Sequence, residues 1–61
     1  MQLLYRPEAA AEVLGIGRSK MFELIAAGQI ETVRIGRARR VPAQALEDYV
    51  ARLRASAGAA A

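Results

Sequence analysis

The sequence predicts a mainly α-helical domain that also contains a small β-hairpin. Three patterns lead to this prediction: two short helical segments separated by a glycine-containing turn, a stretch of β-branched residues, and a third segment with a clear apolar stripe. The 61 residues suffice for one domain, and a domain of this size buries only about 60% of its unfolded surface. Its stability therefore depends on a small apolar core.

The first helix is predicted over residues 7–14, after a short apolar segment, 3–5, that suits an edge strand. Pro7 suits the first helical position because the N–H that proline lacks would have no partner there. Glu8 complements the helix dipole. The apolar stripe of this helix consists of Ala10, Ala11 and Leu14.

A tight turn and a second helix follow. Gly15 and Gly17 bracket Ile16, and a helix-turn-helix joins two helices through a short turn that often contains glycine. The second helix is predicted over residues 18–27, with Gly28 as its stop. Its core-facing residues are Met21, Leu24 and Ile25. A DNA-reading helix presents its contacts from its first turns, which here carry Arg18, Ser19, Lys20 and Glu23.

The next segment changes to the two-residue period of a strand. Residues 30–35 are predicted to form a strand in which Val33 and Ile35 face the core, followed by a turn at 36–38 and a returning strand at 39–41. The hairpin carries four basic residues, Arg34, Arg37, Arg39 and Arg40. Basic residues at hairpin tips are usually solvated surface, but this density is higher than solvation requires and favours contact with nucleic acid.

The third helix is predicted from residue 43 to about residue 53, opened by Pro42. Its apolar stripe consists of Leu46, Tyr49, Val50 and Leu53, which we expect the core to use fully. Residues 55–61 are Ala-rich and are expected to be frayed or disordered. The predicted organisation is therefore a domain over residues 1–54 and a disordered tail over 55–61.

Catalytic chemistry is not indicated. The chain has no Cys and no His, which leaves no disulfide, no usual ligand for zinc, iron or copper, and no ready general base. Ser19 and Ser56 lack a recognisable base, so no activated nucleophile is predicted. No apolar run reaches the roughly 20 residues that span a bilayer. We expect a non-enzymatic cytoplasmic protein, not associated with membranes and without metal or cofactor.

Nucleic-acid contact fits both basic clusters and the net charge of +3. Lys20 is suited to guanine O6 and N7, and Glu23 either to cytosine N4 or to an ion pair with Lys20 or Arg18. Ser19 and the first backbone N–H groups of the helix suit a phosphate oxygen. The arginines of the hairpin suit a phosphate strand or the minor groove. Phe22 is expected to be a half-buried packing residue.

Residues 3–16, the Gly-Arg-Ser-Lys-Met-Phe-Glu-Leu-Ile segment at 17–25, and Val-Arg-Ile-Gly-Arg-Ala-Arg-Arg-Val-Pro at 33–42 resemble the excisionase-type, MerR-like helix-turn-helix family. The resemblance implies a winged helix-turn-helix whose wing is the hairpin. It places DNA contacts at Arg18, Ser19 and Lys20 on the recognition helix and at Arg37 and Arg40 on the wing. Family members bind double-stranded DNA, so the resemblance also implies association with the bacterial nucleoid. Many are recombination directionality factors, which bend DNA and help a tyrosine integrase excise a mobile element.

Three hypotheses for function remain open from the sequence. The first is an excisionase of this type, and the second is a small MerR-like transcriptional regulator that uses the same surface. The third is a protein-interaction module whose basic wing docks an acidic partner; an RNA-binding role lacks a visible aromatic stacking surface. We expect a monomer in solution that assembles cooperatively, head to tail, on repeated DNA sites.

Overall fold

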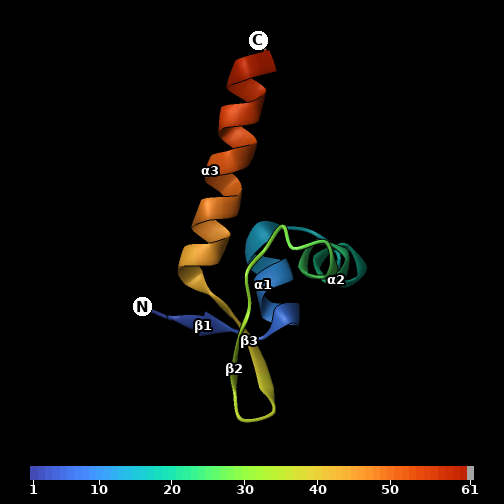
Figure 1. Cartoon of the computed structure of the whole chain (residues 1–61), viewed down its shortest axis with the longest axis vertical. Helices are drawn as coiled ribbons and strands as arrows, with labels where there is room; N and C mark the ends of the chain where they lie inside the picture. The colour runs from blue at the N-terminus through green and yellow to red at the C-terminus, as the bar shows by residue number, and fades with distance from the viewer. Residues whose placement is uncertain (61) are drawn as a thin grey trace.

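The computed structural model describes residues 1–60 of the chain, with side chains described for residues 1–57. The elements in order are β1 (Leu4–Tyr5), α1 (Pro7–Leu14), α2 (Arg18–Ala26), β2 (Val33–Ile35), β3 (Ala38–Pro42) and α3 (Ala43–Ala60). Figure 1 shows the β2–β3 hairpin at one end of the long axis and α3 at the other, with α1 and α2 beside their junction. This arrangement is a winged helix-turn-helix and confirms the predicted fold class.

The sheet has three strands in the order β1-β3-β2, with both pairs antiparallel. β1 is an edge strand, as predicted, and β3 is central. Ile35 pairs with Ala38 across a two-residue turn, in which Gly36 has a φ of 62° and Arg37 does not have a positive φ. A positive φ at the first turn residue belongs to the type II′ turn, whose twist matches that of the flanking strands. The hairpin can therefore stay regular up to its tip.

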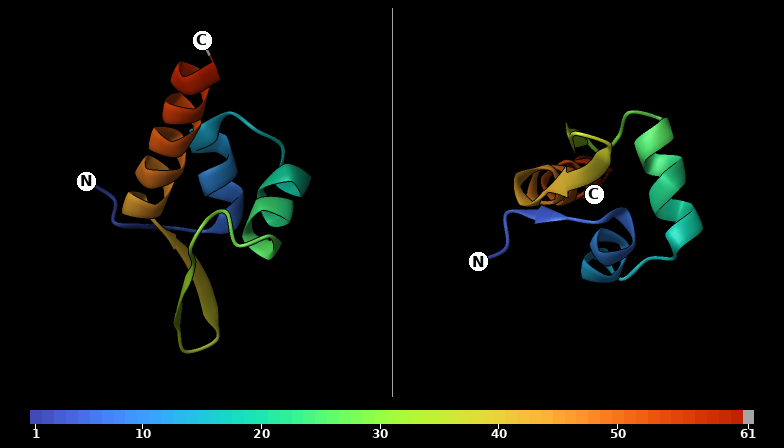
Figure 2. Two further views of the ribbon diagram at one scale, coloured as in Figure 1. Left: turned by 45° about the horizontal axis from the view of Figure 1, so that its top comes forward. Right: turned by 90° about the horizontal axis from the view of Figure 1, so that it is seen from below.

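Backbone hydrogen bonds at a glycine end α1 and set the entry into α2. Gly15 has a φ of 71°, and its N–H donates to the Glu12 carbonyl while the Ile16 N–H donates to the Ala11 carbonyl. This is the Schellman arrangement, which satisfies carbonyls that the helix end leaves free. It also turns Ile16 back against the core. Figure 2 shows α2 crossing beside α1 after this turn.

The core forms where α1, α2, β3 and the start of α3 meet. Its buried residues are Ala10, Ala11, Met21, Ile30, Val41, Ala45 and Leu46. The alanines of α1 permit close approach of α2, and Tyr5, Leu14, Leu24 and Ile25 pack around the centre. Met21, Leu24 and Ile25 thus contact the core as predicted.

The predicted strand at 30–35 differs from the structure at both ends. β2 begins at Val33, and Ile30 is buried in the preceding loop with 2% exposure. Ile35 was predicted to face the core, which is wrong, because 62% of it is exposed. The hairpin extends past the helices, so its tip has nothing to pack against on either face. The alternating pattern correctly predicted a strand but not how far the core reaches along it.

The third helix also departs from its prediction. α3 continues beyond residue 53 to Ala60, so residues 55–60, expected to be frayed or disordered, are helical; residue 61 lies outside the described part. Alanine has the highest helix propensity of all residues, which favours continuation. The apolar stripe is not fully used by the core, because Val50 is 39% exposed and Leu53 is 51% exposed. The core contacts of α3 end near Tyr49, but the helix itself continues to Ala60.

Candidate nucleic-acid interface

The N-terminus of α2 is exposed and free of a side-chain cap. Gly17 precedes the helix in an extended conformation, and the first intrahelical bond runs from the Met21 N–H to the Gly17 carbonyl at 3.1 Å. The backbone N–H groups of Arg18, Ser19 and Lys20 therefore have no acceptor within the helix. The side chains of all three residues are exposed. Backbone donors at a helix start suit an anionic oxygen, such as that of a phosphate.

Met21 holds this exposed turn in place. Its side chain is fully buried in the core, directly after the three exposed residues. Because side chains three and four residues apart share a helix face, burial of Met21 with Leu24 and Ile25 turns Lys20 and Glu23 toward solvent. Both are exposed. The sequence prediction of this face is therefore confirmed, while base contact by these residues stays a prediction.

Arg18 has partners that the sequence did not indicate. Its Nε lies 3.8 Å from Glu8 Oε2 on α1, and its guanidinium carbon lies 5.7 Å from the centroid of the Phe22 ring. The Arg18 and Glu8 side chains are 72% and 53% exposed, so the pair is solvated and weak. The sequence suggested Glu23 as a partner for Arg18, but among residues 1–57 the only ion pair is this one between α1 and α2. No helical spacing could have revealed a contact between two helices.

The hairpin concentrates positive charge without compensation; we call Arg34, Arg37, Arg39 and Arg40 the wing arginines. The register places Arg34 directly opposite Arg39, so their side chains leave the same face of the sheet. Arg37 lies in the turn, and Arg40 is half-buried, with its Nη1 donating to the Arg39 carbonyl at 2.8 Å. Across the described side chains, no carboxylate pairs with any wing arginine.

Like charges directly opposite each other on antiparallel strands destabilise the pair. The Arg34–Arg39 pair therefore costs stability unless an anion lies between or beside the two guanidinium groups. A phosphate oxygen is such an anion, and arginine is suited to bind it with two parallel hydrogen bonds. The wing thus has the chemistry of an anion-binding surface. The four wing arginines share one hairpin, but Arg34 and Arg39 leave one face of it and Arg40, opposite Val33, leaves the other. Arg18, Ser19, Lys20 and Glu23 belong to α2 instead.

Neither a metal-holding cluster nor a membrane-spanning helix is found among the described residues. No group of three or more acidic side chains within them could hold a metal ion. None of the helices in this part of the chain is long and apolar enough to cross a membrane.

The fold and its two basic surfaces define a helix-turn-helix protein, and a family model described as a helix-turn-helix domain matches residues 4–54. A "Probable excisionase" of Saccharopolyspora erythraea is 52% identical over 59 residues, which cover 97% of this chain and 60% of that protein. An "Excisionase" of Streptomyces ambofaciens is 41% identical over 49 residues, 80% of this chain and 77% of that protein. The chain belongs to the excisionase-type helix-turn-helix family.

The chain spans about 60% of the length of the Saccharopolyspora relative. No solved structure matches the chain.

Proposed function

We propose that this chain binds double-stranded DNA and acts as an excisionase, a factor that bends DNA and assists a tyrosine-type integrase in excising a mobile element. The names of the two relatives support excision over transcriptional regulation. The fold supports duplex DNA as the ligand, because a helix-turn-helix presents one helix to the major groove.

The observation that carries the proposal is the uncompensated charge of the wing. Four arginines lie between positions 34 and 40, and among the described residues none has a carboxylate partner. Neutralisation of phosphates by such residues releases counterions and supplies most of the affinity for DNA of any sequence. The wing arginines would follow one phosphate strand or enter the adjacent minor groove, where arginine is electrostatically favoured.

α2 supplies the second part of the interface. Its nine residues make a rod of roughly 14 Å, which fits along a major groove about 12 Å wide. Lys20 would donate to guanine O6 and N7, and Glu23 would accept from cytosine N4. Ser19 and the free N–H groups of the first turn would hold a phosphate and fix the register of the helix. Arg18 would reach the backbone from beside Glu8.

Gel shifts over a salt series test DNA binding. If about five phosphates are contacted, the logarithm of the affinity should fall with the logarithm of the salt concentration at a slope near −4 to −5. An affinity that does not change with salt, or no shift on any duplex, would contradict the proposal. An acidic protein partner that binds the wing without competition from DNA would favour the interaction-module hypothesis instead.

Excision needs its own experiment, because a regulator would shift DNA equally well. Purified chain should stimulate integrase-dependent excision of a DNA carrying the element's two attachment sites, and circularly permuted probes should show a bend at its binding site. DNA binding without stimulation of excision would leave the regulator as the remaining function. An R37A/R40A variant serves as a control in both assays.

A further inference from the structure

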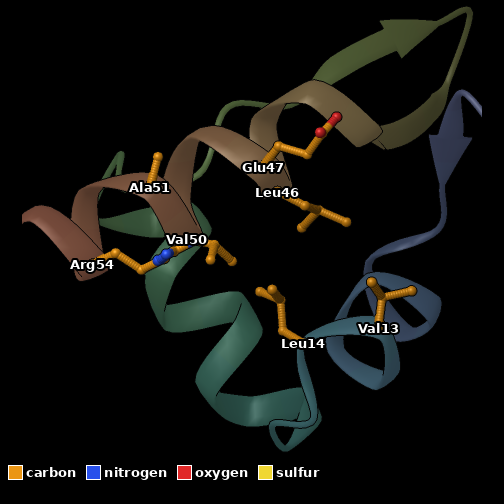
Figure 3. A pocket seen from close by; sticks show the side chains of 7 residues that line it. All are labelled: Val13, Leu14, Leu46, Glu47, Val50, Ala51 and Arg54. Carbon is orange, nitrogen blue, oxygen red and sulfur yellow. The ribbon is translucent and has the colours of Figure 1, made fainter.

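An apolar groove lies where the end of α1 meets α3, and no described part of the chain covers it. Figure 3 shows Val13 and Leu14 of α1 facing Leu46 and Val50 of α3 across this groove. Its volume is about 380 Å³. Val13 is 56% exposed and Val50 is 39% exposed, although both are aliphatic. The groove therefore exposes apolar side chains to water, which is unfavourable unless a partner covers them.

α3 continues past this groove as a projecting helix. Figure 1 shows that its C-terminal half stands clear of the other elements, and every residue from 51 to 57 is exposed. Leu53 exposes 51% of its surface there. Most helices in proteins owe their stability to the packing of an apolar face. The projecting half of α3 has such a face but nothing in the described chain to pack it against.

The groove and the projecting half share one pattern along α3. Leu46, Val50, Leu53 and Ala57 recur at intervals of four, three and four residues, which is the a/d spacing of a coiled coil. Glu47 and Arg54 lie seven residues apart beside this seam and line the same groove. They occupy equivalent heptad positions, which set orientation and partner choice in coiled coils.

We propose that two copies of this chain associate through α3 in antiparallel orientation, so that the projecting half of each helix seats in the groove of the other. In this register Val50 lies opposite Leu53 of the second copy. Ala57 of the second copy lies over the floor of the groove at Leu46, which is itself only 4% exposed. The same register places Glu47 beside Arg54 of the second copy, and two-fold symmetry repeats every contact. Apolar layers and opposite charges thus agree on one alignment.

A parallel pair of α3 helices does not combine the apolar contacts with the Glu47–Arg54 ion pairs. In an in-register parallel pair Glu47 and Arg54 stay about 10 Å apart along the helix axis and form no ion pair. The antiparallel arrangement also lets each copy supply what the other lacks, a projecting apolar helix for an open groove. The expectation of a monomer assumed a fully buried stripe, and the exposure of Val50 and Leu53 removes that assumption.

The pairing has a consequence for DNA, which rests on the proposed function. α3 and the hairpin extend toward opposite ends of the molecule (Figure 1). Antiparallel pairing of α3 therefore directs the two wings away from each other. Such a dimer would hold two separate duplex segments, in contrast to two neighbouring half-sites on one segment.

Sedimentation equilibrium without DNA tests the pairing directly, using charge reversals at its edge. E47R and R54E should each weaken self-association by about tenfold, because each variant turns two attractive pairs into repulsive ones. An equimolar mixture of E47R and R54E should associate as strongly as the unmodified chain, since the charges are again opposite. D48R, the same reversal on the far side of α3, is the matched control and should leave association unchanged.

L53E tests the apolar layers and should abolish association, while circular dichroism confirms that the monomer stays folded. It should still shift DNA, but should not capture a labelled second duplex on an immobilised one, as the unmodified chain should. A chain that remains monomeric up to about 1 mM would overturn the proposal, as would a mixture of E47R and R54E that fails to associate. Association without any DNA shift would leave the pairing intact and contradict only the proposed function.

Discussion

α2 and the wing are both basic surfaces, but they are built in opposite ways. α2 contributes Met21, which is fully buried, and packs Leu24 and Ile25 around the core. The tip of the wing contributes nothing to the core, as the 62% exposure of Ile35 shows. α2 therefore has only one face available for a ligand, whereas at the tip of the wing every residue from 34 to 37 is exposed.

In this short chain, α2 and the wing have different structural roles. An element that must help to fold the domain is held rigidly, and its few free positions are well placed for discrimination between bases. An element that projects beyond the core can carry several like charges at a small cost in stability, because water solvates its side chains. We expect α2 to supply sequence preference and the wing to supply affinity.

Met21→Ala should give the largest effect, because it removes the core anchor of α2. Truncation of a fully buried methionine costs about 2–5 kcal/mol, most of the stability of a domain this small. Thermal unfolding followed by circular dichroism measures the loss. Ile35→Ala is the matched control in the wing and should change stability by less than about 0.5 kcal/mol. Equal losses for the two variants would show that the wing tip also stabilises the fold.

Arg37→Ala with Arg40→Ala should weaken DNA binding by about 100-fold at low salt, equally for all sequences, because two phosphate contacts are lost. The salt slope should become shallower by about 2. Fluorescence anisotropy on specific and random duplexes measures both. Arg54→Ala, at protein concentrations too low for self-association, is the control for a lost charge outside the wing. A loss confined to one sequence would assign base reading to the wing.

Lys20→Ala should relax base preference more than it weakens overall binding. A bidentate contact to guanine contributes about 1–3 kcal/mol of discrimination at one position. Selection from a random duplex pool, compared between Lys20→Ala and the unmodified chain, measures the preference position by position. Ser19→Ala should instead weaken binding evenly, as expected for a phosphate contact. An unchanged preference profile for Lys20→Ala would remove it as a base reader.

Glu8→Gln should give the smallest effect and reveal what the contact with Arg18 does. The pair is exposed, so stability should change by less than about 1 kcal/mol. If Glu8 draws Arg18 away from phosphate, its neutralisation should tighten DNA binding by about two- to fivefold, which anisotropy resolves. Glu12→Gln, on the same helix, controls for the change in net charge. Weaker binding by Glu8→Gln would mean that Glu8 positions Arg18 for contact.

The sequence alone predicted the features that depend on local rules. α1 was predicted with both its ends, since Pro7 and Gly15 act through their own backbone conformations. α2 ends one residue before its prediction, and the wing was predicted with all four of its arginines. These features follow from side-chain periodicity and turn chemistry over a few neighbouring residues. The candidate DNA contacts follow from the same patterns and remain predictions.

The contacts and exposures that depend on how far each element extends beyond the core became known only from the three-dimensional packing. It paired Arg18 with Glu8, because the turn at Gly15 brings the starts of two helices together. It buried Ile30 and exposed Ile35, and it left Val50 and Leu53 uncovered. Periodicity indicates which side of an element is apolar but not where its neighbours end. In a domain with so small a core, the point at which the neighbouring elements end decides whether an apolar residue is buried or is exposed and available to a partner.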